Sequence, residues 1–344
     1  MRRATGILTA VVLLSACGTV AGPTASETAT PPPTLSVGTP TPGFARPTPW
    51  PRVTNLVYDS TTRLVLMFGG LGGGGTTDDT WTWDGATWKL LHPASNPPVR
   101  EGAGLAADPG HSVVVLFGGR NAGNLRDDTW LWDGSNWKQV LPVHSPSPRT
   151  GAALTYDPVR HVVLLFGGEG GGNDTWTWDG IDWTQQAPLT SPPPRAYGRL
   201  AFDVARGVGL LFGGDVLGLD DTWEWNGTNW TRMHPANTPP GWSTATRTPQ
   251  PMVYDAVRHV VMFVGPQQRT SLSADDTMET WTWDGATWTR HAPATTPPPR
   301  DGVGLAFDAA RGIVVMAGGW PVVQNGDVTS TWGWDGATWK QLSA

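Results

Sequence analysis

The pattern of hydrophobic and polar residues along this chain predicts short β-strands and gives no sign of helical spacing. In one representative stretch, "TGAALTYD" (150–157) alternates, and "HVVLLFGG" (161–168) is a continuous apolar run that ends in two glycines. The segments "DTWTW" (174–178) and "WTQQA" (183–187) then flank an Asp-Gly turn. These lengths, alternations and turn residues predict four antiparallel strands in meander order, which we label A to D.

The same pattern recurs six times from about residue 49 onward. Its most constant part is first seen as "DDTWTWDGATWK" (78–89), and the first tryptophan of each copy falls at positions 81, 130, 176, 223, 281 and 332. A spacing of 46 to 58 residues is typical of propellers and solenoids. The copies hold 18 of the 21 tryptophans, and the other three are Trp50, Trp242 and Trp320.

The spacing of the tryptophans predicts a core between sheets. Trp176 and Trp178 lie two positions apart, so both face the same side of strand C. The Asp-Gly pair favours a tight hairpin that places Trp183 on the neighbouring strand D. Each indole can bury roughly 150–250 Å². We therefore expect three tryptophans per unit to fill the space between neighbouring sheets.

The unit resembles a kelch repeat, whose marks are an apolar strand ending in Gly-Gly, an aromatic residue, and a tryptophan shortly after it. Here the marks fall on Gly69-Gly70, Trp83 and Trp88; Gly118-Gly119, Trp132 and Trp137; Gly167-Gly168, Trp178 and Trp183; Gly213-Gly214, Trp225 and Trp230; and Gly318-Gly319, Trp334 and Trp339. Repeat five departs from the pattern, with Val264 in place of the first glycine.

The resemblance implies an all-β fold, a six-bladed kelch-type β-propeller with four antiparallel strands per blade, over residues 49–344. Each unit runs from the innermost strand A to the outermost strand D, so we expect the ring to close without a strand borrowed from the other end. The segment between Arg52 and Asp59 is one residue shorter than in the other copies. An irregular join at blade one is therefore expected.

The N-terminus resembles a bacterial lipoprotein signal. Two arginines precede an apolar run (7–14) that is too short to span a bilayer, and "LSAC" (14–17) leads into the only cysteine of the chain. The resemblance implies removal of residues 1–16 and lipidation of Cys17; an ordinary secretory signal is the alternative. Residues 17–48 are rich in Thr and Pro, and we expect a disordered tether. The predicted location is the extracytoplasmic side of the cell membrane.

The charge balance argues against nucleic-acid binding. Loss of residues 1–16 removes two of the 23 basic residues and none of the 29 acidic ones, which leaves 21 against 29, a net charge of −8. No basic patch is present in the sequence. With a single cysteine, the chain has no disulfide and no cysteine-based metal site.

Meander topology sorts the loops onto two faces. The A–B turns and the C–D hairpins, which share one face, are short, uniform and polar, and this indicates a structural role. The Gly-rich B–C loops and Pro-rich D–A connections share the other face and vary in length, as functional loops often do. Five arginines recur at the start of the inner strands of this second face: Arg100, Arg149, Arg195, Arg247 and Arg300. Such a ring can clamp a carboxylate or phosphate; alternatively, each arginine pairs with a backbone carbonyl or a neighbouring aspartate and fixes the blade junction.

The sequence contains no recognisable catalytic constellation. Acidic pairs before strand C raise the possibility of calcium, but calcium needs six or more oxygen ligands, and we expect neither a metal nor a cofactor. The fold also carries copper oxidases that need a cysteine–tyrosine crosslink, and Cys17 is the predicted lipid anchor. Three of the four tyrosines end inner strands, and Tyr197 stands apart. A sugar-processing enzyme similar to a sialic-acid mutarotase is the enzymatic alternative.

We therefore expect a monomeric, lipid-anchored binding module for a protein or glycan partner, with a purely structural envelope protein as a further alternative. The face with the B–C loops carries the tryptophans outside the repeat. Tryptophan is enriched at binding hot spots and stacks on sugars. The predicted partner site is formed by Trp242 and Trp320 with Arg247 and Arg300 nearby.

Overall fold

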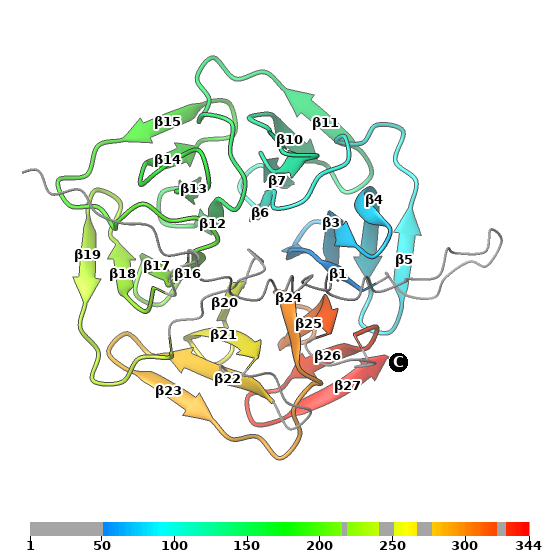
Figure 1. The fold of residues 1–344 in the computed structure, drawn as a ribbon, viewed down its shortest axis with the longest axis vertical. Coiled ribbons are helices and arrows are strands. Elements are labelled where there is room, and N and C mark those ends of the chain that lie inside the picture. The colour runs from blue at the N-terminus through cyan, green and yellow to red at the C-terminus, as the bar shows by residue number, and fades with distance from the viewer. Residues whose placement is uncertain (1–50, 215–218, 241–250, 267–276, 322–327, 344) are drawn as a thin grey trace, which may run out of the picture. The chain divides into compact units, whose positions relative to one another are not determined.

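The structure is a computed structural model that describes residues 51–214, 219–240, 251–266, 277–321 and 328–343. In this part of the chain the secondary structure is entirely β, and the strands form six sheets arranged as the blades of a propeller (Figure 1). The predicted fold class, a six-bladed β-propeller with four antiparallel strands per blade, is confirmed.

The strands follow the predicted order from the centre of the ring outward. The inner strands A are β2 (Leu56–Asp59), β6 (Gly104–Asp108), β12 (Ala153–Asp157), β16 (Arg199–Asp203), β20 (Met252–Asp255) and β24 (Arg300–Asp308). Strands B are β3 (Leu64–Gly72), β7 (Val113–Phe117), β13 (Val162–Phe166), β17 (Val208–Phe212), β21 (Val260–Pro266) and β25 (Ile313–Pro321).

The outer half of each blade holds the tryptophans. Strands C are β4 (Gly75–Trp83), β10 (Thr129–Trp132), β14 (Thr175–Trp178), β18 (Thr222–Trp225), β22 (Met278–Trp283) and β26 (Thr331–Trp334). Strands D are β5 (Trp88–Leu91), β11 (Trp137–Val140), β15 (Trp183–Gln186), β19 (Trp230–Met233), β23 (Trp288–His291) and β27 (Trp339–Ser343). A two-residue ladder of β8 (Arg120–Asn121) and β9 (Asn124–Leu125) extends the B–C loop of blade two.

The ring closes between blades one and six without a shared strand. Blade one consists of β2 to β5 and blade six of β24 to β27, and the inner strands β2 and β24 contact each other. The expected irregularity at blade one is also present: a short strand β1 (Arg52–Val53) pairs with β3 separately from β2, and the pairing of β3 with β4 shifts between Phe68 and Gly70.

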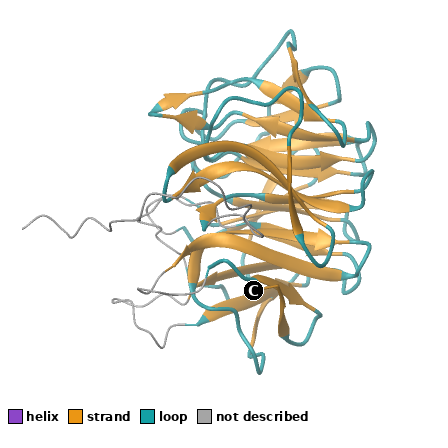
Figure 2. Cartoon of the chain, turned by 90° about the vertical axis from the view of Figure 1, so that its right-hand side faces the viewer, coloured by secondary structure: helices purple, strands orange, loops and turns teal. Residues whose placement is uncertain are grey.

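Two loop faces bound the ring, as seen from the side in Figure 2. We call the face with the B–C loops and D–A connections the BC face, and the face with the A–B and C–D turns the AB face. The C–D hairpin brings the second and third tryptophans of a repeat opposite each other. Trp178 and Trp183 are partners in register, with ring centroids 5.5 Å apart.

The tryptophans fill the space between blades, which confirms the predicted core. Trp178 and Trp183 are almost completely buried and pack with Val115 and Phe117 of the preceding blade. Corresponding clusters join the other blades, including one between blades one and six that contains Trp83 and Ala306. Each sheet therefore buries its two faces by packing against the sheets of the neighbouring blades.

A ring of buried hydrogen bonds also joins the blades. The third tryptophan of each repeat donates its indole N–H to the threonine that precedes the first tryptophan of the blade before it. The pairs are Trp137–Thr80, Trp183–Thr129, Trp230–Thr175, Trp288–Thr222, Trp339–Thr280 and Trp88–Thr331, with distances of 2.8–3.0 Å. The repeated Thr-Trp pair thus has a specific role in holding neighbouring blades together.

The Asp-Gly and Asn-Gly turns make a further contact between blades on the AB face. Gly227, with φ of 100°, adopts a left-handed backbone conformation that favours glycine. It also lies against Arg160 of the preceding blade, whose Nε would be 1.8 Å from a Cβ at this position. Arg160 is itself held by Asp157, which ends the inner strand of its own blade. The backbone conformation therefore favours glycine here, and a larger residue would also require the flexible Arg160 side chain to move.

Candidate binding site at the channel mouth

An aliphatic ring narrows the central channel at its middle. Three residues before the aspartate that ends each inner strand, every blade carries Leu or Met: Leu56, Leu105, Leu154, Leu200, Met252 and Leu305. These six side chains, which we call the collar, line two cavities, one of about 90 Å³ toward the BC face and one of about 630 Å³ toward the AB face. The collar therefore lies between two chambers of the channel.

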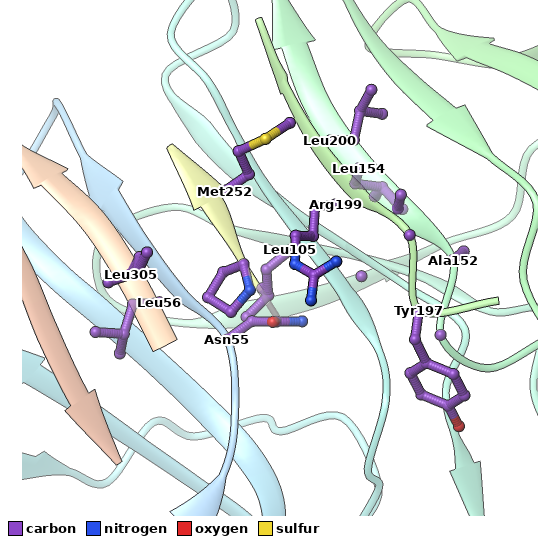
Figure 3. A pocket seen from close by; sticks show the side chains of 15 residues that line it. Asn55, Leu56, Leu105, Ala152, Leu154, Tyr197, Arg199, Leu200, Met252 and Leu305 are labelled. Atoms are coloured by element: carbon purple, nitrogen blue, oxygen red, sulfur yellow. The ribbon is translucent and has the colours of Figure 1, made fainter. Parts of the chain in front are cut away.

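The smaller cavity is the candidate site, because it carries polar side chains at the BC-face mouth. Tyr197, Arg199 and Asn55 line it beside the collar, and in the close-up Arg199 and Asn55 extend into it (Figure 3). All three side chains can donate hydrogen bonds. Among the described residues that line this cavity, the titratable ones are Tyr197 and Arg199.

Tyr197 occupies a backbone position where other blades have glycine. Blades two, three and six place Gly102, Gly151 and Gly302 here, with φ of 63–67°, and Tyr197 has a φ of 57°. Its backbone N–H donates to the Gly151 carbonyl at 2.7 Å. Its ring covers Gly151 so closely that a Cβ there would lie 2.8 Å from ring atoms. The position of the ring is therefore fixed by a neighbouring glycine.

Tyr197 is one of six non-glycine residues with positive φ in the described part of the chain. The other non-glycine residues with positive φ in the described part of the chain lie in turns or loops: Arg63, Ser112, Ala122, His161 and His259. A bulky side chain in this region is uncommon and costs of the order of 1–3 kcal/mol. Tyr197 lies in the bend just before β16, and its strained backbone makes it a candidate site residue.

Arg199 is the second residue of blade four that differs from the residues at the same position in other blades. Blades two, three and six have Gly104, Ala153 and Gly304 at this position, whereas Arg199 is buried. Its guanidinium lies over the rings of Phe212 and Phe263, 5.6 and 5.2 Å from the ring centroids. Burial lowers the pKa of Arg199 to about 9, and the charge of Asp301 opposes this shift. At neutral pH the Arg199 guanidinium is therefore still positively charged, with the charge of Asp301 nearby.

A group of charged side chains from blades two and three borders Tyr197. Arg120 donates to Glu101 at 2.8 Å and lies 3.6 Å from Glu169. Burial is the main cause that raises the pKa of the Tyr197 hydroxyl; Arg120 acts in the opposite direction and the two glutamates add to the increase. The hydroxyl is therefore protonated at neutral pH and can donate a hydrogen bond.

The four predicted arginines among the described residues, Arg100, Arg149, Arg195 and Arg300, are buried and bound within their own blades. The Arg100 guanidinium makes two hydrogen bonds to the Asp128 carboxylate, at 2.6 and 2.8 Å, and a third to the Gly118 carbonyl at 3.0 Å. The same arrangement is found for Arg149 with Asp174 and for Arg195 with Asp221. The partners are those of the alternative prediction, an aspartate and a backbone carbonyl, and both belong to the same blade as the arginine. Ligand binding would require each guanidinium to leave its carboxylate.

We call each pair of arginine and aspartate, such as Arg100 and Asp128, an arginine clamp. The first tryptophan of the repeat also binds the aspartate of this clamp. The indole N–H of Trp130 donates to Asp128 at 2.7 Å and so orients the carboxylate toward Arg100. In blade six a serine replaces the aspartate, and Arg300 donates to the backbone carbonyl and hydroxyl of Ser330. The clamp thus keeps its arginine even where the acid is lost.

The predicted partner site lies only partly within the described residues. Trp320 is half-buried in β25 rather than in a loop, and its cross-strand partner is Asp301, next to Arg300 on β24. Trp320 and Arg300 therefore come from paired strands at the BC face, and their role in a partner site stays a prediction. Trp242, Arg247, Trp50 and Cys17 lie outside the described residues.

Sequence reasoning missed Arg199 and left Tyr197 without a role. A signal was present in the sequence. Blades two, three and six have a glycine and, two positions later, a glycine or alanine at the start of the inner strand, whereas blade four has Tyr197 and Arg199.

In the described ranges no group of three or more His, Cys, Asp or Glu side chains is arranged to hold a metal, and no helix of membrane-spanning length occurs. A scan against protein-family models and a search of curated proteins found no match to this chain, so the kelch resemblance rests on its sequence motifs and the chain itself is assigned to the six-bladed β-propellers by its fold.

Proposed function

We propose that this protein is a lipid-anchored propeller of the kelch type, displayed on the extracytoplasmic side of the membrane, that binds a protein or glycan partner through its BC face. A rigid ring with variable loops on one face is an architecture suited to binding. The lipoprotein-like segment ending at Cys17 and the Thr/Pro-rich stretch after it support attachment to a membrane by a tether.

The observation that carries the proposal is the altered start of the inner strand in blade four. Tyr197 and Arg199 replace a glycine and a small residue, and both substitutions cost stability, one through backbone strain and the other through burial of a charge. Neither is needed to build a blade, since blades two and three form without them. A binding function explains why both are present at one mouth of the channel.

The chemistry of the mouth favours a partner group rich in hydrogen-bond acceptors. Tyr197, Asn55 and Arg199 line the same small cavity, but the Tyr197 ring points away from the other two side chains (Figure 3). The Asn55 amide already donates a hydrogen bond to the Ala103 carbonyl at 2.9 Å. A carboxylate or a sugar hydroxyl in this cavity could accept hydrogen bonds from the Arg199 guanidinium. Trp320, on the same face, offers an aromatic surface for stacking.

The test starts from residues 39–344, which form a compact unit of their own. A glycan array and a pull-down identify the partner, and its affinity is then measured for the double variant Tyr197→Gly/Arg199→Ala, which gives blade four the residues of blade three. We expect at least a tenfold loss of affinity with an unchanged melting temperature or a higher one. Single variants Trp320→Ala and Trp242→Ala test the predicted aromatic part of the site.

The matched control is Ile181→Ser, because Ile181 is 78% exposed on the opposite face. It should leave affinity unchanged. If the double variant and both tryptophan variants bind the partner within twofold of the original chain, the partner site does not lie at this mouth.

A further inference from the structure

The larger chamber of the channel, between the collar and the AB face, has the size and lining of a small-molecule site. Its volume of about 630 Å³ falls within the roughly 300–1,000 Å³ of typical ligand pockets. Its floor is the collar and its walls come from the ends of all six inner strands. It is therefore a chamber with a closed apolar end rather than a groove on the surface.

Aromatic side chains surround this chamber. The residue immediately before the terminal aspartate of the inner strand is aromatic in five blades, namely Tyr58, Tyr156, Phe202, Tyr254 and Phe307, and all five line the chamber. From the sequence, Tyr58, Tyr156 and Tyr254 were interpreted only as the ends of inner strands. Four of the five keep partial exposure, so parts of their rings remain available to an occupant.

Blade two breaks the aromatic ring with Ala107. This small side chain lines the chamber between Tyr58 of blade one and Tyr156 of blade three. A sixth aromatic residue at position 107 would follow the pattern of the other blades and would fill part of the space. The alanine therefore contributes directly to the volume of the chamber.

The lining carries no formal charge. None of the described residues that line the chamber is Asp, Glu, Lys or Arg. The aspartates next to the aromatic ring are buried and bound elsewhere: Asp157, for example, accepts hydrogen bonds from Arg160 and from the amides of its own turn. The polar groups of the lining are the tyrosine hydroxyls, Thr155 and His161, and His161 lies 3.4 Å from the Tyr156 hydroxyl.

The surroundings of the chamber opening are also partly apolar, although the sequence had suggested uniformly polar turns. Val159, Val204 and Val257 belong to the A–B turns of blades three to five and are 57, 52 and 57% exposed. Val204 lines the chamber itself. The prediction of polar A–B turns is wrong for these three blades.

We propose that the chamber on the AB face binds an uncharged, mainly apolar small molecule that stacks against the aromatic ring and rests on the collar. The uncharged lining disfavours an ion, because nothing on the walls would compensate its lost hydration. Few polar groups among aromatic and aliphatic walls are the usual composition of a small-molecule pocket. This site is separate from the proposed partner site, which lies on the other side of the collar.

The experiment titrates residues 39–344 with the uncharged fluorophore N-phenyl-1-naphthylamine and follows its emission. We expect saturable binding of one molecule per chain. Ala107→Trp, which fills part of the chamber beside Tyr58 and Tyr156, should weaken binding at least tenfold, and Tyr156→Ala, which removes a stacking surface, should weaken it about threefold to tenfold. Ala86→Trp adds the same indole to an exposed C–D turn and should have no effect.

Circular dichroism and the melting temperature show whether Ala107→Trp still folds, and Ala107→Phe replaces it if it does not. Binding that is unsaturable, or unchanged in both the filled variant and Tyr156→Ala, overturns the proposal. A second result would also overturn the proposal: the chain does not bind the fluorophore but captures a protein partner through Val204. The chamber would then hold a side chain of that partner instead of a small molecule. Unchanged fluorophore binding in Tyr197→Gly/Arg199→Ala is expected, because that variant alters the other chamber.

Discussion

The indole N–H of Trp88 donates a hydrogen bond of 2.8 Å to the hydroxyl of Thr331, across the junction where blade one meets blade six. The two residues are 243 positions apart, yet the bond repeats the one between Trp230 and Thr175 inside the ring. The junction that closes the ring therefore has the same hydrogen bond between tryptophan and threonine as the other five junctions.

This equivalence predicts equal effects of two substitutions. Thr331→Val and Thr175→Val each leave a buried indole N–H without its acceptor, so each should lower the free energy of unfolding by about 1–3 kcal/mol. Urea denaturation measures both, with the exposed Thr231→Val as the control. A much smaller loss for Thr331→Val would show that the closing junction is already loose.

Truncation of a central tryptophan should be far more costly. Trp178 is completely buried, and Trp178→Ala should lower the free energy of unfolding by about 3–5 kcal/mol because it leaves a large cavity. Trp178→Phe should cost clearly less, since the buried indole nitrogen has no hydrogen-bond partner in the described part of the chain. Denaturant unfolding compares both with Ile181→Ala on the exposed turn. A loss below about 1 kcal/mol for Trp178→Ala would contradict the core role.

The arginine clamps predict loss of stability in acid. Burial alone would raise the pKa of the Asp128 carboxyl, but the hydrogen bond and charge of Arg100 outweigh it and lower this pKa; the pKa values of Asp79 and Asp221 are lowered in the same way. The unfolded carboxyl takes up a proton near pH 3.9, so the clamps contribute fully above about pH 5 and are lost as the pH falls further.

The free energy of unfolding should therefore decrease from pH 5 to pH 3, and Asp128→Asn should reduce the size of that decrease. Denaturant titrations at several pH values measure the slope. Asp78→Asn is the matched control, because the structure shows no such clamp for Asp78 among the described side chains. An unchanged slope in Asp128→Asn would mean that other groups control acid stability.

The membrane anchor is tested at Cys17. Cys17→Ser removes the thiol that would carry the lipid, so the protein should be released from membranes or remain with its N-terminal segment uncleaved. Detergent partitioning and N-terminal sequencing distinguish these results. Unchanged partitioning, with a mature N-terminus elsewhere, would exclude the lipoprotein interpretation.

The blade was predictable from sequence because its determinants are local and repeated. Trp176, Trp178 and the Asp-Gly turn specify a hairpin within ten residues, and six copies make the pattern unambiguous. The clamp was only half predictable. Arg100 was recognised, but its partner Asp128 is 28 positions away and shares the position with Glu279 and Ser330 in other blades.

The candidate site could not be predicted because it depends on contacts between blades. Tyr197 is placed by Gly151, a residue of the preceding repeat, and Arg199 is placed by two phenylalanines on different blades. The sequence showed that Tyr197 was unusual, but not that its backbone is left-handed or that its ring lies at a cavity. Likewise, the aromatic residues before the terminal aspartates line a common space only once the ring is closed.

The collar has a consequence for communication between the two ends of the channel. Six aliphatic side chains, one from each blade, separate the positively charged Arg199 from the uncharged chamber beyond. They provide neither hydrogen-bond donors nor acceptors for a continuous file of water between the two cavities. The two ends of the channel therefore differ in polarity across a single apolar layer, with a buried arginine on one side and an uncharged lining on the other.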